Sequence, residues 1–231
     1  MLTDTAILRS KPVVQKASKS NVGGMEHLAM ADDLITRIQR LAETPSTRTD
    51  QGQISGTDPF PPVGPEEVAQ AEHRLGFSLP PFLGELYRRV GNGGFGPGFG
   101  LIGLPGGYLH DDAKSIVEMY ESYHVAYPDY PSWQWPDRMV PICDWGCAIF
   151  SCVDCNAGSV ITFDPGEQPE GEPMTVAFVE SHPSVVDWFE DWANGVRLWD
   201  KMYERDPIGE TTFNNPFTGK PMVRYRTRLR R

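Results

Sequence analysis

The sequence lacks several features that would assign it to a class at once. None of its apolar runs approaches the roughly 18–20 residues that a membrane-spanning helix needs. Residues 1–20 contain a few basic side chains but not the apolar core of a secretory signal. Four cysteines without such a signal are typical of a reducing compartment, where thiols stay free or bind metal. We therefore expect a cytoplasmic protein without a membrane segment.

Positive charge is scarce where most of the chain lies. Residues 58–205 hold 8 Lys/Arg against 23 Asp/Glu, a net charge of −15, whereas residues 1–57 carry +1 and residues 206–231 carry +4. An acidic body repels the phosphates of nucleic acid, so we expect no direct nucleic-acid partner. A basic protein is the more natural partner, although acidity also serves solubility alone.

Periodicity and loop signals divide the chain into one domain with an extension at each end. Residues 1–29 show no apolar periodicity and are interpreted as a disordered extension or a mis-assigned start. Residues 30–205 would form a single domain, with an internal linker at 44–62 that is rich in Thr, Ser, Gly and Pro. Residues 206–231 are a basic C-terminal tail, for which we expect a solvated, mobile terminus.

Within the domain, helices precede and follow a run of short strands. Asp111 and Asp112 would cap the helix that begins there. Helices around consecutive antiparallel strands indicate an α+β fold, a central and mainly antiparallel sheet flanked by helices. The helices are expected at 31–43, 65–75, 80–90, 111–128 and 183–203, and the strands at 99–104, 139–144, 147–154, 159–164 and 174–179.

All four cysteines lie in one stretch, ICDWGCAIFSCVDC, at 142–155. Structural zinc sites usually set two short knuckles apart, and these spacings do not. Cys147 and Cys152 are separated by an odd number of positions, so on a regular strand they face opposite sides and cannot share one tetrahedral ion. A Cys152–Cys155 redox pair lacks a thioredoxin-like context. We favour core packing of a β-hairpin over zinc or redox chemistry, and expect no metal and no cofactor.

Three other patterns indicate chemistry only weakly. The GNGGFG stretch matches a dinucleotide-binding spacing, but it follows a predicted helix and precedes a predicted strand, the reverse of what that motif needs. A nucleophilic pair of Cys147 with His110 or His182 has no local support. Asp144 and Asp154 flank the predicted hairpin strand and would form a paired-carboxylate site if they approached each other. Turn and strand-end roles are favoured for both.

Several motifs occur in a fixed order: AEHRLGFSLPPFLGELYRRVGNGGFGPGFGLIGL, then VPICDWGCAIFSCVD, then VITFDP. Together they resemble the SUKH superfamily, bacterial immunity proteins related to the fungal Smi–Knr regulators of cell-wall synthesis. The resemblance covers roughly residues 31–203. The residues that carry it, called the signature residues below, are Glu72, Gly76, Leu79, Pro80, Asn92, Gly93, Asp144, Trp145, Gly146, Cys147, Cys152 and Asp154.

The resemblance implies an α+β fold and a non-enzymatic role. It implies a protein that binds and neutralises a toxin or effector delivered between competing bacteria, and an acidic body suits the occlusion of a basic surface. We interpret the signature residues as fold determinants and not as the interface. A housekeeping or regulatory interaction scaffold, as the fungal relatives suggest, is the alternative, and an unrecognised enzyme or metalloprotein is a third.

The partner-binding face of an immunity protein should be acidic and built on loops and helix ends, because recognition usually lies on loops that a rigid scaffold positions. The candidate residues are Asp111, Asp112, Glu118 and Glu121 after the glycine-rich turn, and Glu167, Glu170 and Glu172 in the loop 165–173.

Overall fold

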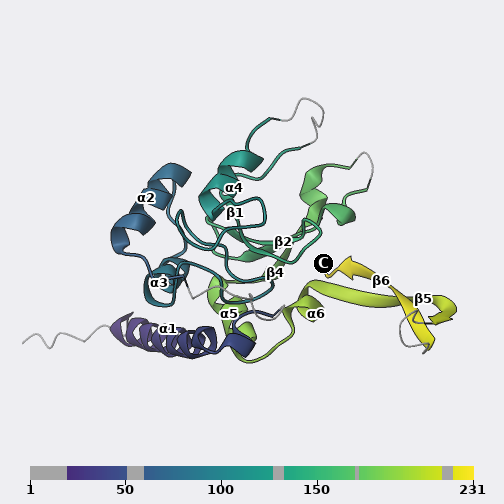
Figure 1. Ribbon diagram of the computed structural model, residues 1–231, viewed down its shortest axis with the longest axis horizontal. Helices are drawn as coiled ribbons and strands as arrows, with labels where there is room; N and C mark the ends of the chain where they lie inside the picture. Colours follow the sequence, from purple (N-terminus) through teal and green to yellow (C-terminus); the bar gives the residue numbers. More distant parts are fainter. Residues whose placement is uncertain (1–19, 51–59, 127–132, 170–171, 215–220) are drawn as a thin grey trace, which may run out of the picture.

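The computed structural model describes residues 20–50, 60–126, 133–169, 172–214 and 221–231 (Figure 1). Its α-helices are α1 (Ser20–Glu43), α2 (Pro65–Leu75), α3 (Pro81–Arg89), α4 (Ile116–Tyr123), α5 (Val185–Ala193) and α6 (Leu198–Met202). Its strands are β1 (Met139–Asp144), β2 (Phe150–Asp154), β3 (Val160–Phe163), β4 (Phe178–His182), β5 (Tyr203–Asn214) and β6 (Pro221–Leu229). Short 3-10 helices are η1 (Pro45–Thr47), η2 (Pro165–Glu167) and η3 (Met174–Ala177).

Strands β1 to β4 form one antiparallel sheet, and neighbours in the chain are neighbours in the sheet. Helix α4 contacts β1 and α2, whereas α1 contacts α3 and α5 (Figure 1). Antiparallel strands can be joined by short turns, so consecutive short strands can form this sheet without long crossover connections. An antiparallel sheet with helices packed around it confirms the predicted α+β fold.

Helices α2 and α3 form the helical hairpin that the proline and glycine positions predict. Pro65 lies in the first turn of α2, and Gly76 ends the helix with a φ of +81° while its N–H donates to the Glu72 carbonyl at 2.9 Å. The Glu72 carboxylate accepts the Leu79 N–H at 2.8 Å. Glu72 thus holds the chain across the corner that leads into α3.

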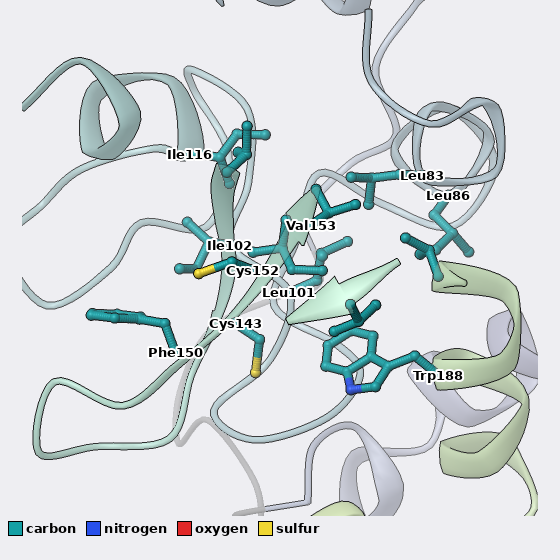
Figure 2. Close-up of a cluster of buried hydrophobic side chains, with 14 of the residues drawn as sticks. Leu83, Leu86, Leu101, Ile102, Ile116, Cys143, Phe150, Cys152, Val153 and Trp188 are labelled. Atoms are coloured by element: carbon teal, nitrogen blue, oxygen red, sulfur yellow. The ribbon is translucent and has the colours of Figure 1, made fainter. Parts of the chain in front are cut away.

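One apolar core joins the helices to the sheet (Figure 2). Leu83 and Leu86 of α3 and Trp188 of α5 are fully buried, and Val153 of β2 is buried with them. Ile116, the first residue of α4, is also fully buried. The core therefore depends on helices that are far apart in the sequence and on the central strands.

The cysteines are divided between this core and the surface. Cys143 and Cys152 are fully buried among the aliphatic side chains of Figure 2, Cys155 is half-buried, and Cys147 is exposed. Core packing therefore describes Cys143 and Cys152 but not Cys147.

The predicted strand over 147–154 is wrong at its start. Gly146, Cys147 and Ala148 have φ values of +86°, +53° and +61° and form the turn between β1 and β2, so that β2 begins only at Phe150. Positive φ is incompatible with extended backbone for these residues. The argument that Cys147 and Cys152 face opposite sides of one strand therefore does not apply.

Thiol labelling is expected to separate the four cysteines. Burial raises the pKa of Cys143 and Cys152 well above the usual thiol range and that of Cys155 to about 12. Because the thiolate is the reactive form, Cys147 should be the only thiol that reacts rapidly with DTNB in the native chain. We expect one fast equivalent for the wild type and none for Cys147→Ser. Two or more fast thiols in the native wild type would contradict the burial described.

Two further predicted elements are interrupted by glycine. The predicted strand 99–104 is reduced to an isolated bridge between Leu101 and Cys143, because Gly100 and Gly103 flank it at turns and close backbone approaches. The helix predicted at 183–203 divides into α5 and α6 at Gly195, whose φ of +74° ends the first of them.

Two predicted starts are also displaced. The strand predicted at 174–179 begins as the 3-10 helix η3, and β4 follows from Phe178. Helix α4 begins at Ile116 and not at Asp111 and Asp112, because Ser115 is its N-cap. Ser115 and Glu118 form a reciprocal capping box, which is the stronger start signal.

Both ends of the chain hold structure that the sequence did not predict. Helix α1 begins at Ser20, inside the extension 1–29 that was predicted to be disordered; residues 1–19 lie outside the described residues. Within the predicted tail 206–231, β5 and β6 pair as an antiparallel hairpin that extends away from the rest of the molecule (Figure 1). Glu204 of β5 pairs with Arg228 of β6, so the basic end of the chain lies against an acidic strand.

The predicted linker 44–62 is partly packed. It contains η1, and Arg48 and Thr49 are buried, while residues 51–59 lie outside the described residues. Thr49 forms a parallel bridge to Gly96, which ties this segment to the glycine-rich loop.

Candidate functional site

The signature residues near the glycine-rich loop bind backbone. Asn92 is only 3% exposed; its Oδ1 accepts the Leu104 N–H at 2.8 Å and its Nδ2 donates to the Leu104 carbonyl at 3.4 Å. Gly93 has a φ of +87°, and a Cβ there would lie 2.5 Å from the Leu101 carbonyl oxygen. These contacts support the interpretation of both residues as fold determinants.

A second group of signature residues shapes the turn between β1 and β2. Asp144 Oδ1 accepts the Gly146 N–H at 2.7 Å, and its Oδ2 lies 3.3 Å from His110 Nε2. The hydrogen bond to Asp144 raises the pKa of His110. Trp145 is buried and donates its indole N–H to Ser151 Oγ at 2.9 Å. The turn is therefore held at both its start and its centre.

Asp144 and Asp154 do not form a paired-carboxylate site. In the register of the hairpin, Asp144 lies opposite Phe150 and Asp154 lies opposite Met139, so the two carboxylates are at opposite ends. Asp154 Oδ1 accepts the Asn156 N–H at 2.8 Å in the next turn. The favoured turn and strand-end roles describe both residues.

The histidines considered as partners for Cys147 have other partners. His110 pairs with Asp144, and His182 Nε2 lies 3.3 Å from Asp191 Oδ2. Desolvation lowers the pKa of His182, which keeps it a neutral residue near pH 7. Neither geometry supplies a base for the Cys147 thiol.

The predicted partner-binding carboxylates differ in their surroundings. Asp111 and Asp112 are exposed in the turn before α4, where Asp112 Oδ2 lies 3.8 Å from Lys114 Nζ. Glu121 is bound by Arg74 of α2 at 2.7 Å, and Glu118 lies 4.0 Å from the same guanidinium. Hydrogen bonds from Ser115 lower the pKa of Glu118, which caps its own helix.

The second predicted cluster lies in the segment between β3 and β4. Glu167 ends η2 and is half-buried, and Glu172 is exposed. Glu170 lies outside the described residues. Asp164 is engaged with the fold, because its Oδ2 accepts the Tyr203 hydroxyl at 2.6 Å. This cluster thus borders the base of the β5–β6 hairpin.

A pocket that the sequence did not predict lies between the β1–β2 turn and the bend from α5 to α6. Its cavity of about 270 Å³ is lined by Asp50, Trp145 and Trp199, together with residues of the bend from Gly195 to Leu198. The two indole rings are 6.0 Å apart. The pocket was missed because Asp50 lies in the segment interpreted as a linker.

Asp50 is exposed as a residue, but its carboxylate is partly enclosed. It accepts hydrogen bonds from the Gly98 backbone and the Trp192 side chain. Desolvation outweighs these two bonds and raises the pKa of Asp50 to about 6. A carboxylate with a raised pKa in a hollow is a candidate for a functional role.

Metal-binding clusters and membrane-spanning helices are two further classes of functional feature. In the part of the chain that the structure describes, no group of three or more His, Cys, Asp or Glu side chains is arranged to hold a metal ion. Of the helices described, none has both the length and the apolar character needed to cross a bilayer.

Comparison of the sequence with protein-family models matches the part of the chain that carries the signature residues. The model of the SMI1 / KNR4 family (SUKH-1) matches residues 62–201, a span that holds α2 to α5, the four-stranded sheet and all signature residues. The chain belongs to this family. Comparison with curated proteins gives no match. As a SUKH-1 member, the chain is a protein-interaction module in the general sense that the family supports.

Proposed function

We propose that this SUKH-1 chain is an immunity-type inhibitor that binds a basic toxin or effector domain and covers its functional surface. The observation that carries the proposal is the net charge of −15 over residues 58–205, which contain the whole matched span. Opposite charge steers association and disfavours wrong partners. If the acidic charge served solubility alone, a SUKH-1 domain would not be required.

The structure favours the turn before α4 as the first acidic contact. Asp111 and Asp112 are exposed, and the ion pair of Asp112 with Lys114, at 3.8 Å, stays within the turn. By contrast, a partner that used Glu121 would compete with Arg74, which already binds it at 2.7 Å. We therefore expect Asp111 and Asp112 to contribute more to association than Glu118 and Glu121.

The candidate toxin is a protein whose gene lies next to the gene of this chain. In the direct test, bacteria express that protein with and without the full chain, and their survival is measured. Co-expression is expected to restore growth, and the two proteins should purify as a complex. If the chain binds that protein without reducing its toxicity, or does not bind it, the immunity role is wrong and an interaction scaffold is the better account.

Neutralising the turn should slow association. For Asp111→Asn/Asp112→Asn, we expect an association rate constant lower by about three- to tenfold at low salt, with little change in dissociation, because rim charges act mainly on encounter. The wild-type rate should fall steeply with added salt, and that of the variant less so. Surface plasmon resonance across salt concentrations measures both.

Glu66→Gln/Glu67→Gln provides the matched control. It removes the same amount of charge from the exposed N-terminal turn of α2. Equal slowing by both variants would show that net charge alone matters and that the turn before α4 is not the contact.

A further inference from the structure

The pocket beside Trp145 combines aromatic faces with a carboxylate. Trp145 comes from the β1–β2 turn, Trp199 from α6, and Asp50 from the segment after η1. Trp199 is partly exposed and stacks on Tyr203 with ring centroids 4.5 Å apart, which fixes its orientation. Indole faces attract cations, and a carboxylate supplies a charge-assisted hydrogen bond.

The opening of the pocket can admit a side chain. Gly195 lines it, and a Cβ at this position would meet no atom within 4 Å. Arg197 also lies at the rim, but its side chain is 74% exposed and its Nε is 3.5 Å from Asp200 Oδ2. Among the described residues that line the pocket, Arg197 alone is positively charged, and it is directed to a carboxylate other than Asp50.

An apolar contact lies beside the pocket. Gly98, whose backbone bonds Asp50, packs so closely on Trp145 that a Cβ would lie 3.2 Å from the indole. The next residue, Phe99, is 40% exposed and lies against Gly146. A partner that reached the pocket would therefore also cover an exposed aromatic ring, as interface centres usually do.

We infer that the pocket formed by Asp50, Trp145 and Trp199 binds a cationic side chain, arginine or lysine, of a basic protein partner. As an account of where the partner docks, this inference rests on the proposed function. The chemistry of the pocket can be tested without the partner.

The charge of Asp50 is not needed by the fold. Its pKa of about 6 in the folded chain lies above the ordinary value of 3.8, so the folded state binds this proton more tightly than the unfolded state. The resulting stabilisation is present at low pH and is lost as the pH rises through about 6. Among the described residues, Arg197 at the rim and the buried Cys143 thiol are ionisable groups close to Asp50, and desolvation remains the largest influence on its pKa.

Asp50→Asn should therefore weaken binding while it preserves or raises stability. At pH 7.5 we expect a melting temperature equal to that of the wild type or higher by about 2 °C, and a smaller difference at pH 4.5. A loss of binding in this variant cannot then be attributed to unfolding.

The first arm of the test uses acetyl-arginine methylamide and its uncharged isostere acetyl-citrulline methylamide. The full chain is titrated while the indole N–H resonances of Trp145 and Trp199 are followed by NMR. The arginine compound is expected to shift both resonances saturably and the citrulline compound to leave them unchanged. Asp50→Asn should weaken binding of the arginine compound roughly tenfold, and Glu66→Gln, a control carboxylate in the exposed first turn of α2, should not. Equal shifts with both compounds, or equal affinity in Asp50→Asn, overturn the inference.

The second arm uses the candidate toxin and separates the two hypotheses. If the arginine compound binds as expected but the wild-type chain does not bind the toxin, the proposed function fails and the pocket stands. If the toxin binds wild type and Asp50→Asn equally, the pocket is not where it docks, and the inference fails while the proposed function stands.

Discussion

Deletion of residues 1–43 is expected to unfold the domain, whereas deletion of residues 1–29 should leave its melting temperature nearly unchanged. Leu34, Ile35 and Ile38 of α1 are 0–2% exposed. Burial of three such aliphatic side chains contributes roughly 5–8 kcal/mol as an upper value, which is comparable with the whole stability of a typical domain. Circular dichroism of the two truncated chains, heated in parallel, measures the difference.

Polar contacts of α1 add to this dependence. Arg37 donates to Asn194 Oδ1 at 2.9 Å and lies 3.4 Å from Glu190, both at the end of α5 or just after it. The shorter deletion is the control, because residues 1–29 show no apolar periodicity and the next residue, Met30, is 65% exposed. Helix α1 precedes the matched span, residues 62–201. Equal tolerance of both deletions would show that α1 is not part of the folded domain.

Replacement of Asn92 by alanine is expected to lower the free energy of unfolding by about 1–3 kcal/mol. The Asn92 side chain satisfies both the N–H and the carbonyl of Leu104, and all of these groups are buried. Alanine would leave the buried Leu104 N–H without this partner, and an unsatisfied buried group costs about 1–3 kcal/mol. The Leu104 carbonyl would still accept the Gly107 N–H at 2.9 Å. Urea denaturation at constant m-value measures the loss.

Asn156→Ala is the matched control for that substitution. Asn156 is exposed, and its side chain accepts from Arg138 at 3.1 Å on the surface, so we expect a change within about 0.5 kcal/mol. A similar small change for Asn92→Ala would mean that the buried network around Leu104 does not stabilise the loop.

The sequence indicated the α2–α3 corner and the order of the central strands because their signals are local. Pro65 and Gly76 mark a helix by their own backbone preferences, and short apolar segments separated by turn residues mark antiparallel strands. The same reasoning misplaced the start of β2, because positive φ at Cys147 and Ala148 is not encoded by residue type. In this turn Asp144 accepts the Gly146 N–H, and the Trp145 N–H donates to the Ile149 carbonyl, contacts that become visible only in the folded chain.

What the sequence by itself determined is the α+β class, the SUKH resemblance and the acidic charge of the body, all of which follow from composition, periodicity and motif order. Only the tertiary structure decided which carboxylates contact other parts of the fold. Glu121 is bound by Arg74 across two helices, and Asp50 meets Trp145 and Trp199 from positions nearly 100 and 150 residues away. Such juxtapositions depend on how helices pack on the sheet, and no local preference of the chain specifies them.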